Sequence, residues 1–214
     1  MMTGATPPRA AMPKVLLALS PLLPPILFPG IGTLVSLAIV LLSLTFVRAS
    51  RMPTLSFTGG AWRKMLLLGL VAGVTLSVAI NFAIEPGLEA LFGRDVYLED
   101  FAAVRGNLEA YLMMLAVGLI FGGVIEELIF RGFVIGWGTA LLGERAAIWL
   151  ALLSAAAFGI THLYQGWVGV LSTGLAGLAF GLVYLRAGRA LLPAIIVHML
   201  MNLVGITLIY LGLD

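Results

Sequence analysis

The apolar run from Gly122 to Gly132 contains three charged side chains within a stretch of six residues. Each charge placed in hydrocarbon costs at least ~2.5 to 3.5 kcal/mol, so these residues need a structural or chemical reason. On a helix, Glu127 and Arg131 are four residues apart and can neutralise each other on one face. Glu126 is turned by about 100° from Glu127 and has no such partner, which makes it the candidate for chemistry. A helix end in the headgroup region, with Arg131 snorkelling, would also explain the three charges.

The two histidines of the chain both lie in apolar segments. His162 follows Phe158 by four residues, and His198 is followed one helical turn later by Asn202 on the same face. Taken alone, His162 could be an interfacial histidine, and His198 with Asn202 could be an interhelical hydrogen-bonding pair, worth about 0.6 kcal/mol per bond. Together with Glu126, however, they concentrate polar groups in three segments of a chain that otherwise avoids them. Ionisable residues at membrane depth face a cavity or each other, so we expect one polar cavity within the membrane.

A carboxylate and two imidazoles can carry out one of two kinds of chemistry. They can orient and deprotonate a water molecule, or they can supply three ligands to a zinc ion. The zinc set would be Glu126, His162 and His198. The helical HExxH zinc motif is absent from the sequence.

Three short motifs follow one another in the second half of the chain. They are Glu126-Glu127-x-x-x-Arg131, Phe158-x-x-x-His162 and His198-x-x-x-Asn202. In this order they resemble the signature of the CAAX prenyl endopeptidase and bacteriocin-processing family of intramembrane proteases. The resemblance covers about residues 108–202, and the first half of the chain carries none of it. It implies an all-α fold, a polar chamber within the bilayer and hydrolysis of a peptide bond by an activated water.

Carried over position by position, the resemblance implies that Glu126 is the general base and that His162 helps to hold the water. His198 and Asn202 would stabilise the oxyanion, a role in which loss of one donor typically costs ~10²–10³ in kcat. Three further residues would shape the site: Glu127, Arg131 and Phe158. The implied substrate is a peptide or a prenylated protein. We expect no obligatory metal or other cofactor, with zinc as the alternative.

The composition places these motifs in a membrane. Of the 214 residues, 61% are hydrophobic and 10% are charged, against about a quarter charged in a soluble domain. We therefore expect a polytopic, all-α transmembrane helical bundle whose partners are the lipid bilayer and the substrate. The net charge of +2 comes without a basic stripe, so nucleic acid binding is not expected. The absence of cysteine excludes disulfides and thiolate catalysis.

Seven apolar segments predict about seven spans in a single transmembrane domain, residues 15–214, with a polar tail at 1–14 and a catalytic core at 108–202. The segments are 15–29, 33–47, 65–83, 108–131, 146–162, 168–185 and 191–213. Prolines and short lengths make the first two either a hairpin of thin spans or one long broken span. Residues 132–142 would continue helically along the cytoplasmic interface. The acidic connection 85–107 would lie outside, either on the membrane surface or as a plain loop.

This topology conflicts with the expected site at one point. By the positive-inside rule, the amino end is inside and Glu126 lies toward the cytoplasmic end of its span, whereas His162 lies at the far end of the fifth. Either the fifth helix stops below the membrane surface, with residues 164–167 lining a cavity, or one span is oriented wrongly. The motif grouping takes precedence over the charge rule here, because a wrong span assignment is the commoner error.

The leading functional prediction is a CAAX-protease-like intramembrane endopeptidase in a prokaryotic plasma membrane. The alternative is a non-catalytic immunity or binding protein on the same scaffold. The four intact polar residues of the expected site argue against that alternative. A proton-coupled transporter is less favoured, because transporters often have paired halves with matching broken helices, whereas this chain is polar only in its second half.

Overall fold

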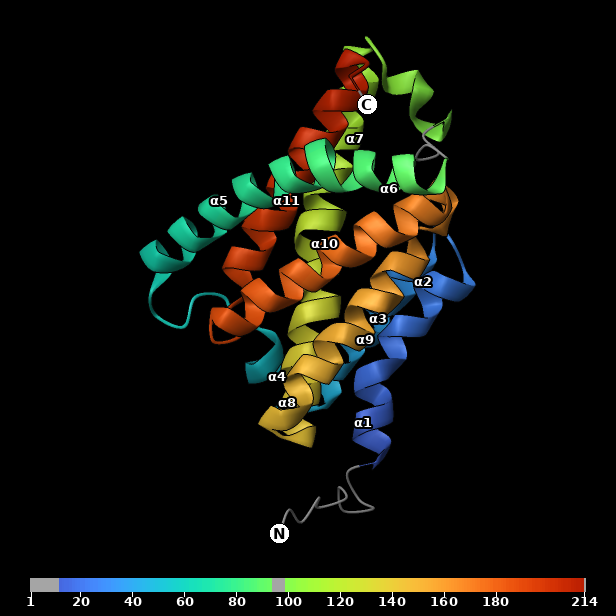
Figure 1. Ribbon diagram of the computed structural model, residues 1–214. Helices are drawn as coiled ribbons and strands as arrows, with labels where there is room; N and C mark the ends of the chain where they lie inside the picture. Colours follow the sequence, from blue (N-terminus) through green and yellow to red (C-terminus); the bar gives the residue numbers. More distant parts are fainter. Residues whose placement is uncertain (1–11, 94–98, 214) are drawn as a thin grey trace.

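The computed structural model describes residues 12–93 and 99–213, and within these ranges the chain forms helices and connecting turns without a β-strand. The all-α prediction is confirmed. Most of the predicted tail at 1–14 lies outside the described residues, but its last three residues already belong to helix α1 (Met12–Leu19). Helix α1 begins at one end of the molecule and the last helix finishes at the other (Figure 1).

Five helices among the described residues are long and apolar enough to cross a membrane. They are Trp62–Phe92, Leu108–Leu142, Glu144–Thr161, Leu163–Arg186 and Leu191–Leu211. A sixth span results if α3 (Gly32–Phe46) and α4 (Arg48–Thr54), which are bent by 119°, are counted as one. The predicted count of about seven is therefore approximate. The protein is an integral membrane protein whose first apolar helix is shorter than a full span.

The amino-terminal segments form a hairpin of thin helices, as the first of the two alternatives predicted. Helix α1 continues through a 3₁₀ turn, η2 (Ser20–Leu22), into α2 (Leu23–Leu27), and α3 then runs back along it. The Ser36 hydroxyl donates a hydrogen bond of 2.7 Å to the Pro21 carbonyl across the hairpin. Prolines remove backbone donors from a helix, and this side-chain donor satisfies one of the carbonyls in the proline-rich arm.

One long helix occupies the centre of the molecule (Figure 1). It consists of α7 (Leu108–Val117), a π-helical segment η5 (Gly118–Trp137) and α8 (Gly138–Leu142). The segment was expected to leave the membrane after Arg131 and follow the interface. Instead, residues 129–139 are all buried, because α3, α4 and α9 surround them. Helical continuation is thus confirmed, but its place at the interface was wrong.

Two glycines of the central helix let α4 approach it closely. A Cβ added at Gly132 would lie 2.6 Å from the Thr54 carbonyl oxygen, and one at Gly136 would lie 2.7 Å from that of Pro53. Both distances are below what any side chain tolerates, so only glycine permits this contact. The short α4 is thereby held against the buried half of η5.

The remaining helices form antiparallel neighbours around the central one. A short turn, η6 (Glu144–Ala146), leads into α9 (Ala147–Thr161), and η7 (Leu163–Gln165) leads into α10 (Gly166–Arg186). The glycine stripe Gly174, Gly177 and Gly181 faces α9, where it meets Gly159, Phe158 and Ala151. Small residues at such a seam permit close helix approach. Helix α11 (Leu191–Leu211) packs against α5 and η5.

The third span is longer than its sequence indicated. Helix α5 (Trp62–Ala79) continues through a π-helical turn, η3 (Ile80–Ile84), into α6 (Glu85–Phe92), where the sequence predicted a connection from residue 85 onward. The Glu85 amide donates to the Ile80 carbonyl five residues back. Pro86 therefore stands in the first turn of α6, where its missing donor is tolerated. Beyond it, residues 94–98 lie outside the described ranges, and η4 (Glu99–Val104) follows.

Candidate active site

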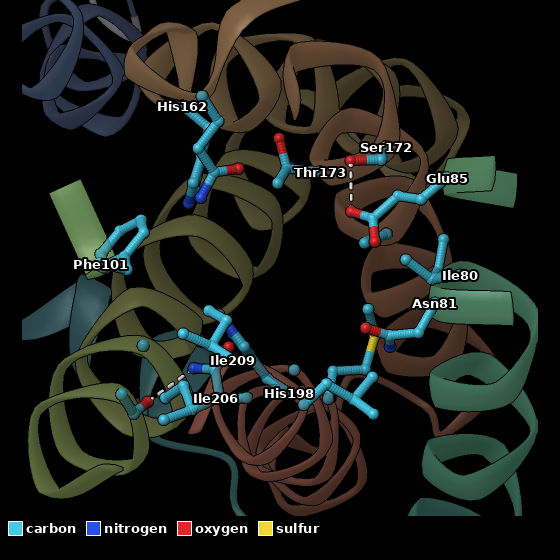
Figure 2. Close-up of a pocket in the computed structure, with 18 of the residues that line it drawn as sticks. Ile80, Asn81, Glu85, Phe101, His162, Ser172, Thr173, His198, Ile206 and Ile209 are labelled. Carbon is cyan, nitrogen blue, oxygen red and sulfur yellow. Dashed lines mark hydrogen bonds between the residues drawn. The ribbon is translucent and has the colours of Figure 1, made fainter. Parts of the chain in front are cut away.

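A cavity of about 640 Å³ lies among all five long helices. This volume is within the range of small-molecule and cofactor sites. Five of the seven predicted site residues line it: Glu126, Phe158, His162, His198 and Asn202. Figure 2 shows His162 and His198 pointing toward the hollow from different helices. The structure therefore brings together side chains that are up to 76 positions apart in the sequence.

Glu127 and Arg131 lie beneath the cavity wall and not on it. Both side chains are fully buried, and Arg131 Nη1 donates to Glu127 Oε1 at 2.7 Å, as the i,i+4 spacing predicted. Arg131 Nη2 donates to the Gly177 carbonyl on α10 at 2.7 Å. His198 Nδ1 is 2.8 Å from the same Glu127 oxygen. The pair thus joins η5, α10 and α11 into one charge-assisted network.

Aromatic rings enclose this network. The Arg131 guanidinium carbon lies 5.0 Å from the Phe158 ring centre and 5.1 Å from that of Phe180. The His198 ring is 5.7 Å from Phe158 and 4.7 Å from Phe180. Cation–π contact favours the buried guanidinium, and the rings restrict how His198 can turn. Phe158 therefore packs against both Arg131 and His198.

A hydrogen bond of His162 shows which of its two ring nitrogens carries the proton. Helix α9 ends at this residue, and its Nδ1 lies 2.8 Å from the Phe158 carbonyl oxygen. A carbonyl can only accept, so Nδ1 carries the proton. The neutral ring then has an unprotonated Nε2, which is available to accept a hydrogen bond in the cavity.

His198 and Asn202 converge over Gly122. A Cβ added to this glycine would lie 2.4 Å from Asn202 Nδ2 and 3.3 Å from His198 Nε2. Asn202 Nδ2 donates one hydrogen to the Gly118 carbonyl at 2.7 Å, which leaves its second hydrogen free of that bond. His198 Nε2 is 3.9 Å from Glu126 Oε2, whose side chain is 19% exposed. Two nitrogens and one carboxylate therefore border a single small space.

The conflict in the predicted topology is resolved by the turn at Gly143. Glu126 lies 17 residues before this turn and His162 lies 19 residues after it. Antiparallel helices place residues at similar distances from their connection at a similar level, so both side chains line the same cavity near the middle of the long helix. Helix α9 has 15 residues, about 22 Å at 1.5 Å per residue. Of the residues expected beyond it, Tyr164 and Gln165 line the cavity.

The residues that could hold zinc are not arranged as a metal site. Within residues 12–93 and 99–213, no group of three or more His, Cys, Asp or Glu side chains is placed to bind a metal ion. Glu126, His162 and His198 border the same cavity without converging on one point. As placed, this donor set does not fit a resident zinc ion.

A second polar wall of the cavity was not predicted. Its members, on η3, α6 and α10, are Asn81, Glu85, Glu89, Ser172 and Thr173. The Ser172 hydroxyl donates to Glu85 Oε1 at 2.9 Å (Figure 2). The sequence assigned Glu85 to the acidic connection 85–107, which was expected to lie outside the membrane. The apolar periodicity that continues through Leu88 and Leu91 was the available signal that the helix did not end there.

Comparisons with known proteins gave a family match in the second half of the chain and a curated relative. Residues 107–204 match the family model described as type II CAAX prenyl endopeptidase Rce1-like. The chain is 31% identical over 112 residues to the Putative membrane peptidase YdiL of Bacillus subtilis (strain 168), a match that spans 52% of this chain and 43% of that relative. No solved structure gives a significant match. The matched segment is less than half of the chain, contains all seven predicted site residues and is similar to the Rce1-like type II CAAX prenyl endopeptidases.

Proposed function

We propose that this protein is an intramembrane endopeptidase that hydrolyses a peptide bond with a water activated by Glu126. One observation carries the proposal: Glu126, His162, His198 and Asn202, from three separate helices, line a single cavity. The family match supports peptidase activity at the level of the family.

The nucleophile is a water held between Glu126 and His162. Glu126 accepts one proton of the water as general base, a contribution of typically ~10²–10⁴ to the rate. The unprotonated Nε2 of His162 accepts a hydrogen bond from the other water hydrogen, which fixes the direction of attack. The bond from His162 Nδ1 to the Phe158 carbonyl keeps the ring in the tautomer that this role requires.

The oxyanion forms where Asn202 and His198 converge over Gly122. When the water oxygen attacks the carbonyl carbon, the carbonyl oxygen takes up the negative charge, and the second N–H of Asn202 donates to it. His198 can donate from Nε2 only if both ring nitrogens carry protons, because Nδ1–H is already directed at Glu127. Glu126, Glu127 and Arg131 together carry a net charge of −1. With both ring nitrogens protonated, His198 donates to the oxyanion from Nε2 and offsets this charge.

Collapse of the tetrahedral intermediate completes the reaction. Glu126 returns its proton to the departing nitrogen, the C–N bond breaks, and a carboxylic acid and an amine are released. The acid then passes its remaining proton to the amine, which gives a carboxylate and an ammonium group. Buried Glu127 does not take part in these transfers. It holds the His198 ring and offsets the charge of Arg131.

We further propose that the reaction requires no resident metal and takes place in a prokaryotic plasma membrane, on a peptide or prenylated-protein substrate. Metal independence predicts that a strong chelator leaves the rate unchanged. Loss of activity on chelation, with recovery on addition of zinc, would contradict it.

The test is a cleavage assay with purified protein and a panel of quenched fluorescent peptides, each made with and without a prenyl group. Mass spectrometry of the products identifies the bond that is cut. We expect cleavage by the wild type and none by Glu126→Gln, with Glu109→Gln as control. Glu109 is an exposed carboxylate on α7 and does not line the cavity. Equal cleavage by the Glu126→Gln protein would refute the catalytic role, and a phenotype that survives all site substitutions would indicate a non-catalytic binding protein.

A further inference from the structure

We propose that Glu85 selects substrates that carry a positive charge, from a lysine or arginine side chain, close to the bond that is cleaved. This inference rests on the proposed function, since it assigns the substrate class of the same cavity. It starts from the second polar wall, which the family motifs do not include and which lies outside the matched residues 107–204 except for Ser172 and Thr173.

The fold directs the Glu85 side chain into the cavity. The π-helical turn η3 ends at Ile84, and Glu85 follows it at the start of α6. The Ser172 hydroxyl, 2.9 Å from Glu85 Oε1, holds the carboxylate from α10. Figure 2 shows Glu85 and Asn81 on one side of the hollow and His162 on another. Asn81 Nδ2 donates to the Ser77 carbonyl at 2.9 Å, which leaves its oxygen as a further acceptor.

The protein does not neutralise this carboxylate in the way it neutralises Glu127. In the described ranges, Glu85 forms no ion pair, and no lysine or arginine lines the cavity. A half-buried carboxylate with a neutral hydroxyl as partner is costly to desolvate. A cation brought by the substrate would offset that cost and form a charge-assisted hydrogen bond. An extra carboxylate in the same space would instead be repelled.

The rest of the lining indicates what surrounds the charge. Apolar side chains also line the cavity, among them Phe82, Met114, Val117, Phe121 and Ile206. Lysine and arginine have long apolar stems that pack on such surfaces while the charged end reaches a polar partner. The cavity therefore fits an apolar peptide segment that contains one basic residue. A free terminal carboxylate bound beside Glu85 would be disfavoured.

The experiment uses sets of peptides that are identical except at one position, which is Lys, Met or Glu, scanned on either side of the cleaved bond. Cleavage is measured with the wild type, and binding is measured by fluorescence anisotropy with the Glu126→Gln protein. At one position we expect Lys to be favoured over Met about tenfold or more in kcat/KM, the range of a hydrogen bond to a charged group. Glu85→Gln should remove this preference by slowing the Lys peptide and leaving the Met peptide unchanged.

Two further variants separate recognition from a structural role. Glu85→Lys should reverse the preference, so that the Glu peptide is favoured over the Lys peptide. Ser172→Ala should reduce the preference in part, because the carboxylate loses the hydroxyl that orients it. Glu109→Gln removes the same charge outside the cavity and should change neither peptide.

The inference is overturned if Lys and Met peptides bind and react equally at every position, or if Glu85→Gln slows both to the same extent. Its failure can be told apart from failure of the proposed function. If no peptide is cleaved but the Lys peptide still binds more tightly and loses this advantage in Glu85→Gln, the substrate class stands and the peptidase proposal falls.

Discussion

Glu126 and Glu85 reach the same cavity from two polar walls. The first wall holds Glu126, His162, His198 and Asn202, and the second is the wall that holds Glu85. The two carboxylates have similar helical surroundings but different hydrogen-bond and charge partners. Each carboxylate lies in or directly after a π-helical segment, η5 or η3, a kind of irregularity that is frequent at functional sites. Glu126 stands beside an imidazole in a network of two acids, an arginine and His198. Glu85, by contrast, accepts a hydrogen bond from the neutral hydroxyl of Ser172. The first wall brings its own counter-charges, and the second leaves a charge for a ligand to balance.

The comparison separates chemistry from recognition. Residues that activate water and stabilise an oxyanion must be oriented before the substrate arrives, so their partners are part of the protein. A residue that selects a substrate gains specificity when its partner comes only with the correct ligand. Substitutions on the first wall should lower the rate for every substrate, and substitutions on the second should change which substrate is preferred.

The largest expected effect comes from Glu126→Gln. Loss of the general base should lower kcat by about 10²–10⁴ for all peptides, while the dissociation constant stays close to that of the wild type. Steady-state kinetics and equilibrium binding check this. A fall in kcat that is confined to peptides with a basic residue would show that Glu126 recognises the substrate and does not act as the general base.

Asn202→Ala should lower kcat by about 10²–10³, the usual cost of removing one oxyanion donor. KM should hardly change, because the amide binds the charge that develops in the transition state and not the resting carbonyl. A rise in KM with unchanged kcat would show that Asn202 binds the substrate in its ground state.

Breaking the buried ion pair should cost stability. Glu127→Gln leaves the Arg131 charge uncompensated at a site with no exposure, which in buried pairs costs about 3–5 kcal/mol. The double variant Glu127→Gln with Arg131→Met should recover part of this, since no unpaired charge is left. Unfolding in a denaturing detergent measures both proteins. Additive losses in the double variant would contradict a coupled pair.

Gly122→Ala should give a smaller loss, with the fold retained. The added methyl group would lie 2.4 Å from Asn202 Nδ2, so the amide must move, whereas no backbone stands in the way. Misplacement by about 1 Å can cost up to about 10² in rate, and we expect a loss of between ten- and a hundredfold. Gly123→Ala, whose methyl would meet the flexible Met199, tests whether any added side chain here has the same effect.

The sequence predicted the first wall well because its residues carry recognisable spacing. Four residues separate Glu127 from Arg131, and four separate His198 from Asn202, so each pair shares a helix face. Charges and imidazoles are also rare in such an apolar chain, which made them conspicuous. Their meeting in one cavity followed from the rule that polar groups at depth seek each other.

The second wall could not be predicted from such signals. Glu85 and Ser172 are 87 residues apart, and a serine in a helix carries no indication of its partner. The acidic residues of 85–107 indicated a connection, whereas the helix continues through the π-helical turn η3 into α6. The level of His162 was misjudged for a related reason, because residues 132–142 were assigned to the interface and not counted as part of the span.

The roles proposed for both walls require that water reaches Glu126. Because the chain contains no cysteine, the accessibility of this position can be measured directly with single cysteine variants. Single variants Glu126→Cys, Val134→Cys and Glu109→Cys are treated in native membranes with a charged, water-borne thiol reagent, which requires an accessible thiolate. We predict that Glu126→Cys reacts as Glu109→Cys does, whereas Val134→Cys, which is fully buried, reacts only after unfolding. A Glu126→Cys protein as unreactive as Val134→Cys would contradict the account.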